Sequence, residues 1–167
     1  IATTGLRSGE FQWTEQFLQA YRYALPEAEQ ENAFAFNLAS LYFEKQDFAR
    51  TLETLQNVEF TDITYHIGAK LLLLKTYFHL GASEALASML SSTEQLLRRD
   101  KSLSTFGKAT NLNFLRMLRK IAAWRLKNAR ASSKEAQQKR QVLQEKLARL
   151  QPVVNKDWLL KVLEQGA

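Results

Sequence analysis

A period of 34 to 35 residues runs through the first half of this chain. Two stretches align on each other, the first carrying Leu38, Ala39, Tyr42, Phe48, Thr51, Leu52 and Leu55, the second Leu73, Leu74, Tyr77, Ser83, Ala85, Leu86 and Leu90. Self-similarity of this length, in sequence that has the spacing of helix–turn–helix units, is typical of a helical solenoid. Because solenoids mostly present surfaces to other molecules, the period favours a binding function over catalysis.

The motif within each stretch resembles the tetratricopeptide repeat. That repeat has a large–small pair and an aromatic residue on its first helix, then an aromatic, a small residue and a leucine on its second. LASLYFEKQDFARTL (38–52) follows the pattern, and LLKTYFHLGASEAL (73–86) follows it with a turn one residue shorter. A half repeat precedes them, with Phe11 at the second-helix aromatic and Pro26 at the terminal proline.

The resemblance covers roughly residues 9–98, and the chain is also similar to the C-terminal part of bacterial tetratricopeptide repeat proteins of unknown function. It implies an all-α, right-handed helical solenoid that acts as a protein-binding scaffold. Tyr42 and Tyr77 would then be buried between helices. We expect about two and a half repeats over residues 1–98, followed in the same domain by a basic helical C-terminal cap over residues 99–167.

Only 6 Gly and 2 Pro interrupt the chain, so long helices are unobstructed. Asp47 and Asn155 are placed to cap the starts of helices, and Gly81 to end one. Ser132 and Glu135 have the spacing of a capping box. The expected helices span residues 10–25, 27–45, 47–57, 62–80, 83–99, 104–130 and 132–150, with a short last helix after Asn155.

Charge is divided unevenly, with a net −6 over residues 1–97 and +12 over residues 98–167. In the helix expected at 104–130, one face is apolar, with Phe106, Phe114, Leu115, Met117, Leu118, Ile121, Ala122 and Trp124. The 3.6-residue period places six cations opposite it, within a wedge of about 120°. These residues, called here the basic face, are Lys108, Arg116, Arg119, Lys120, Lys127 and Arg130.

Several interpretations of the basic face stay open. It is a solvated surface, since lysine and arginine are usually exposed, or it is a platform for an acidic protein or peptide. Such a partner could be the acidic half of a neighbouring copy. Nucleic-acid binding through the basic C-terminal helices is the alternative function, since a basic stripe is what phosphate contacts require. A membrane surface is disfavoured because the apolar face of the helix is needed for the core.

The resemblance also implies a partner-binding groove lined by the first helix of each repeat. Carried over by position, its residues are Phe36, Asn37, Ser40, Phe43, Lys75, Phe78 and His79. Phe36 and Ser40 stand where the family's carboxylate clamp has Lys and Asn, so an apolar partner segment fits this groove better than a free carboxylate. The other interpretation is that the phenylalanines belong to the core.

Catalytic chemistry has little support, and we expect no enzyme activity, metal site or cofactor. The chain has no cysteine, which excludes a thiol nucleophile and mildly favours a cytoplasmic location. His66 and His79 lie thirteen residues apart on one expected helix, hence on different faces. No phosphate-binding or dinucleotide motif is present, and no apolar run approaches the ~20 residues of a membrane span. Because Ile1 is not an initiator methionine, we expect a fragment or a processed form.

Overall fold

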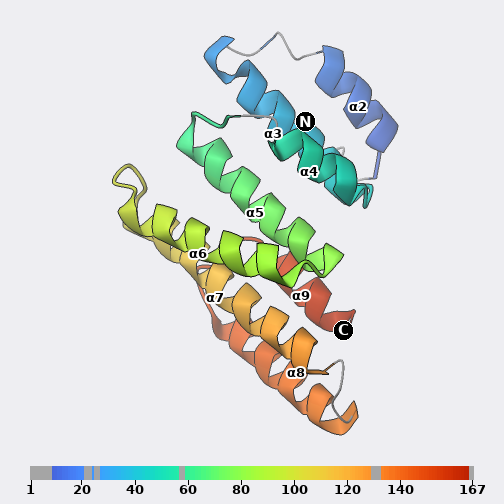
Figure 1. Cartoon of the computed structure of the whole chain (residues 1–167), viewed down its shortest axis with the longest axis vertical. Coiled ribbons are helices and arrows are strands. Elements are labelled where there is room, and N and C mark those ends of the chain that lie inside the picture. The colour runs from blue at the N-terminus through green and yellow to red at the C-terminus, as the bar shows by residue number, and fades with distance from the viewer. Residues whose placement is uncertain (1–8, 21–23, 25–26, 57–58, 129–132, 166–167) are drawn as a thin grey trace. The chain divides into compact units, whose positions relative to one another are not determined.

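The computed structural model describes residues 9–20, 24, 27–56, 59–128 and 133–165. This part of the chain consists of eight α-helices and contains no strand, which confirms the predicted all-α class (Figure 1). The chain divides into two compact units, Ile1–Met89 and Leu90–Ala167, and the division falls inside α6. The helices are α2 (Phe11–Ala20), α3 (Glu27–Glu44), α4 (Phe48–Gln56), α5 (Ile63–Leu80), α6 (Ser83–Arg99), α7 (Thr105–Asn128), α8 (Ser133–Arg149) and α9 (Lys156–Glu164).

In the first unit, α3 packs against three other helices, α2, α4 and α5, and α4 also packs against α5 (Figure 1). This arrangement explains why apolar residues occupy more than half of the circumference of α3, since a helix with several neighbours has no wide solvent face. Ala39 and Leu41 of α3 and Leu74 of α5 are completely buried. The first unit is therefore built around α3.

The C-terminal ends of α3 and α5 have the same backbone geometry. Gln46 and Gly81 both have a left-handed backbone, with φ of 59° and 67°. Two backbone hydrogen bonds close each helix end. At the end of α3, Gln46 N donates to Phe43 O and Asp47 N donates to Tyr42 O. At the end of α5, Gly81 N donates to Phe78 O and Ala82 N donates to Tyr77 O. This is the Schellman motif. Every equivalent pair is 35 residues apart, so the predicted one-residue shortening of the second turn is wrong, and Thr51 is equivalent to Leu86.

We expect Gln46→Gly to raise the free energy of unfolding by up to ~1 kcal/mol, because glycine adopts a positive φ without the steric cost of a Cβ atom. The reciprocal change, Gly81→Gln, should lower the stability by about the same amount. A Cβ atom at Gly81 would meet nothing within 4 Å, so backbone strain alone would be measured. Urea unfolding followed by circular dichroism checks both. Effects of equal sign at the two positions would contradict the equivalence of the turns.

A second recurrence links α2 to α4, with an offset of 37 residues. Thr14 and Thr51 are completely buried, and each hydroxyl donates to the backbone carbonyl four residues earlier, on Glu10 and Asp47 respectively, at 2.8 and 2.9 Å. Leu18 and Leu55 follow them as buried leucines. The pattern Phe-x-x-Thr-x-x-x-Leu therefore places a Thr and a Leu on the buried face of both helices.

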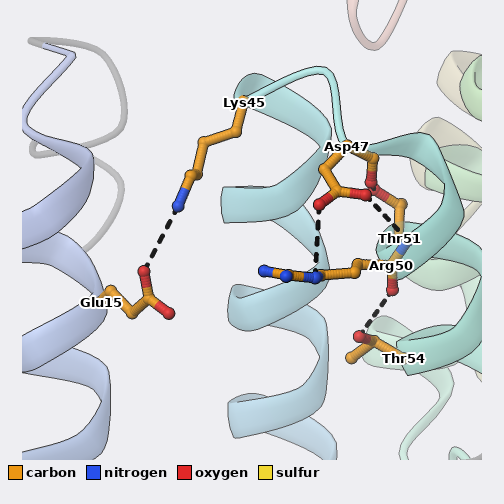
Figure 2. A network of polar contacts seen from close by, with 6 residues as sticks. All are labelled: Glu15, Lys45, Asp47, Arg50, Thr51 and Thr54. Carbon is orange, nitrogen blue, oxygen red and sulfur yellow. Dashed lines mark hydrogen bonds and ion pairs between the residues drawn. The ribbon is translucent and has the colours of Figure 1, made fainter.

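Side-chain caps begin two helices of the first unit. Asp47 accepts a hydrogen bond from the backbone N of Arg50 at 3.1 Å, which confirms the predicted cap of α4 (Figure 2). Asp62 likewise accepts from the backbone N of Thr64 and Tyr65 at the start of α5. Figure 2 also shows Lys45, just after α3, reaching Glu15 of α2 at 3.4 Å. Short local bonds thus fix where α4 and α5 begin.

In the second unit, α7, α8 and α9 pack against one another. Their shared core includes Phe114, Leu147 and Leu159, all completely buried. The Asn113 amide of α7 donates to Pro152 O at 2.9 Å and so holds the segment before α9. The Phe114 ring of α7 meets the Trp158 ring of α9 at 6.1 Å.

One prediction for this unit is wrong and another holds only in part. Phe106 is 69% exposed rather than part of the apolar face, because it lies in the first turn of α7. Asn155 is the residue that precedes α9, as predicted, and its carbonyl accepts a hydrogen bond from Leu159 N at 3.1 Å. Its side chain makes no capping hydrogen bond, since its left-handed backbone (φ 52°) differs from the extended conformation of a capping residue. The predicted helix ends at Leu25, Asn57 and Arg130, together with Pro26 and Ser132, lie outside the described residues.

Candidate functional site

Four of the seven predicted groove residues lie close together in the first unit. His79 stacks on Phe48 with ring centroids 5.1 Å apart and meets the edge of Phe43 at 5.6 Å. Phe78 also contacts His79, at 6.1 Å. Lys75 places its Nζ over the Phe43 ring, 4.6 Å from the centroid. We call these five residues the aromatic cluster; Phe48 was not predicted for this site, although it was visible as a repeat position.

Within this cluster the phenylalanines of the predicted groove belong to the core. Phe43 is 6% exposed and Phe78 is 5% exposed. Too little of either ring reaches solvent to edge a groove, because Phe48 of α4 and His79 of α5 pack on Phe43. The sequence left this alternative open, and the burial supports it.

The other three predicted groove residues are engaged within the first unit. Phe36 meets the Tyr65 ring at 5.9 Å, and a Cβ atom at Gly68 would come within 2.9 Å of the Phe36 ring. The Asn37 amide donates to Ala33 O at 2.7 Å, and the Ser40 hydroxyl donates to Phe36 O at 2.8 Å, both on α3 itself.

Burial lowers the pKa of Lys75 to about 8, and the nearby carboxylate of Glu44 opposes this effect. A cation held against an aromatic face gains some stabilisation from the ring quadrupole. That gain offsets only part of the cost of removing an ammonium group from water. Burying the charged form of Lys75 therefore lowers the free energy of unfolding of the protein.

The basic face of the second unit divides into two parts. In the first part, Glu94 of α6 binds Arg119 of α7 at 3.1 Å and Arg98 at 2.7 Å. These hydrogen bonds from the two guanidinium groups lower the pKa of Glu94. Arg116 is exposed and donates to the Asn113 side chain at 3.2 Å. The charge of Arg119 is thus partly neutralised within the protein. Lys108 is half-buried at the start of α7, and Arg130 lies outside the described residues.

In the second part, Lys120 and Lys127 line an open cleft of about 560 Å³ between α7 and α8, which we call the lysine cleft. Lys139 of α8 also lines it. All three lysines are exposed, and within the described ranges no carboxylate forms an ion pair with them. The remaining lining residues are Trp124, Glu135, Gln138, Val142 and Leu143.

The apolar part of the lysine cleft is held in place by α7–α8 contacts. Trp124 is 8% exposed, and its indole Nε1 donates to Ala136 O of α8 at 3.2 Å. Val142, in contrast, is 44% exposed. The sequence gave no sign that Lys139 of α8 would line a cleft together with Lys120 and Lys127 of α7. The cleft therefore combines an apolar surface with a cationic rim.

Other site chemistry is sparse along the described parts of the chain. They contain no group of three or more His, Asp or Glu side chains that could hold a metal ion, and none of their helices is long and apolar enough to cross a membrane. His66 lies on α5 apart from the aromatic cluster, and burial, with a smaller effect of Lys70, lowers its pKa. Among the described residues, the lysine cleft places three exposed lysines, for which no ion pair is formed there, beside the exposed Val142.

Comparison with known proteins identifies no relative. No family model matches this chain, and neither a curated protein nor a solved structure shows significant similarity to it.

Proposed function

We propose that this chain is a non-catalytic protein-binding module with tetratricopeptide-like helical repeats, and that it binds an acidic partner segment in the lysine cleft. The single observation that carries the proposal is the combination in this cleft of three unpaired lysines with exposed Val142. Charge on the rim speeds and orients docking, whereas burial of an apolar anchor supplies most of the affinity.

The repeat organisation is supported by the recurring features of the first unit. The ends of α3 and α5 share one hydrogen-bond pattern at an offset of 35 residues, and α2 and α4 share a buried Thr and Leu. Helix pairs of this kind, stacked on their neighbours, form the continuous core of a solenoid. In this proposal the repeats belong to the first unit, and the second unit carries the lysine cleft.

Nucleic acid is a weaker candidate for the lysine cleft. Trp124, the aromatic residue in the lining, is buried against α8 and so cannot stack on a base. A peptide with carboxylates around an apolar side chain matches the same lining better.

The test is fluorescence anisotropy with two labelled probes, a synthetic amphipathic helix with Glu around a Leu and Trp face, and a random DNA duplex. We expect Lys120→Glu/Lys139→Glu to weaken peptide binding about tenfold or more through two reversed rim charges. The matched control, Lys101→Glu/Lys161→Glu, has the same net charge change at exposed positions outside the cleft. Equal peptide affinity in the two variants would refute the site. Tighter binding of DNA than of peptide, lost in the cleft variant alone, would favour the nucleic-acid alternative.

A further inference from the structure

A partner for the lysine cleft with the opposite charge exists within the chain itself. Residues 1–97 carry a net charge of −6, and residues 98–167 carry +12. Two copies can therefore attract each other whenever the acidic part of one meets the basic part of the other. An occupant of the cleft needs an apolar anchor in addition to negative charge.

Trp13 on α2 provides such an anchor. Its side chain is 45% exposed. An exposed tryptophan is a candidate anchor, because tryptophan is among the residues that most often dominate the binding energy of interfaces. Its ring stacks on Phe17 with centroids 5.3 Å apart and an interplanar angle of 19°. This contact restricts the side chain before binding, so that less conformational entropy is lost on docking.

The charges around Trp13 suit the cleft. Glu10 lies one helical turn before Trp13 and is exposed. Glu15, in contrast, is bound to Lys45. The other exposed positions of α2 include Gln12, Gln16 and Gln19, which carry no charge to repel a lysine. Trp13 thus combines an exposed aromatic ring with one nearby carboxylate.

We infer that the lysine cleft of one copy binds α2 of a second copy, with Trp13 against Val142 and Glu10 beside the lysine rim. This inference rests on the proposed function of the cleft and names its partner. Because α2 and the cleft are different surfaces, the contact is heterologous, and one copy can donate α2 while it accepts another in its cleft. Association is then open-ended unless it closes into a ring.

Sedimentation velocity of the full chain provides the test, over a range of concentrations at low and high salt. We expect the weight-average sedimentation coefficient to rise with concentration, and less so at high salt, where exposed charges are screened. Trp13→Ala and Lys120→Glu/Lys139→Glu should each reduce the association constant about tenfold or more. Lys101→Glu/Lys161→Glu is the charge-matched control and should associate more strongly than the cleft variant.

Mixing the variants gives the sharper result. Trp13→Ala keeps an intact cleft, and Lys120→Glu/Lys139→Glu keeps an intact α2, so each variant alone is expected to associate about tenfold or more weakly than the parent. Together they should form one 1:1 complex that cannot grow, because a single intact pair of surfaces remains. A parent that is monomeric at all concentrations, or a mixture that stays monomeric, overturns the inference. If the acidic peptide still binds the cleft in that case, the proposed function stands; if it does not bind, both fail.

Discussion

Phe43→Ala is expected to lower the free energy of unfolding by about 3–5 kcal/mol, as is usual when a buried aromatic side chain is truncated. Phe43 is 6% exposed and meets side chains from two other helices, Phe48 of α4 and both Lys75 and His79 of α5. Its removal would leave a cavity where α3, α4 and α5 come together. Urea unfolding followed by circular dichroism measures the loss.

Tyr42→Ala is the matched control for this prediction. Tyr42 precedes Phe43 on α3 but is half-buried, as Tyr77 is, so the expectation that both tyrosines are buried is wrong. The Arg50 guanidinium lies 5.5 Å from the Tyr42 ring centroid. Folding buries less apolar surface at Tyr42 than at Phe43, so we expect Tyr42→Ala to lower the free energy of unfolding by only about 1–2 kcal/mol. A larger loss for Tyr42→Ala than for Phe43→Ala would show that the repeat tyrosine, rather than the phenylalanine, holds the helices together.

Local sequence signals predicted the all-α class and the positions of several helix ends. Asp47 before an apolar stretch and Gly81 after one marked helix ends correctly, because a cap depends on the few residues next to it. The equivalence of the two turns was harder to predict. Gln46 adopts the left-handed conformation that Gly81 also adopts, and a glutamine gives no sign of that in the sequence. The motif alignment consequently placed a shortening where the backbone has none.

The candidate sites were less predictable, because they depend on how the helices rotate about their axes. Periodicity gathered the basic residues of α7 on one face but could not show that Glu94 of α6 binds Arg119. It also could not show that Lys139 of α8 joins Lys120 and Lys127 around an apolar surface. These pairings join different helices, and each requires the packing angle between them. The net charge of α7 is therefore visible in the sequence, whereas the pairing of Arg119 with Glu94 is not.

Lys75→Met is expected to stabilise the protein at pH 7. Burial lowers the pKa of Lys75 from 10.5 to about 8, which means that the folded state binds this proton less tightly than the unfolded state does. Each pKa unit corresponds to about 1.4 kcal/mol. Lys75 is only half-buried, so solvent screening reduces that value. Methionine would also lose the contact of the ammonium with the Phe43 ring, worth about 0.5–1 kcal/mol. The expected net gain is about 1–2 kcal/mol.

The pH dependence separates this electrostatic effect from better packing of methionine. Below about pH 8 the lysine is charged in both states, and the folded parent bears the full cost. Between about pH 8 and 10.5 the folded state has released the proton while the unfolded state retains it, so the stability of the parent rises with pH. The advantage of Lys75→Met should therefore shrink across this interval, measured as the difference between urea unfolding curves of parent and variant at each pH. An advantage that stays constant from pH 7 to 10.5 would assign the gain to packing, and a variant less stable than the parent at pH 7 would show that the contacts of the ammonium outweigh the cost of its burial.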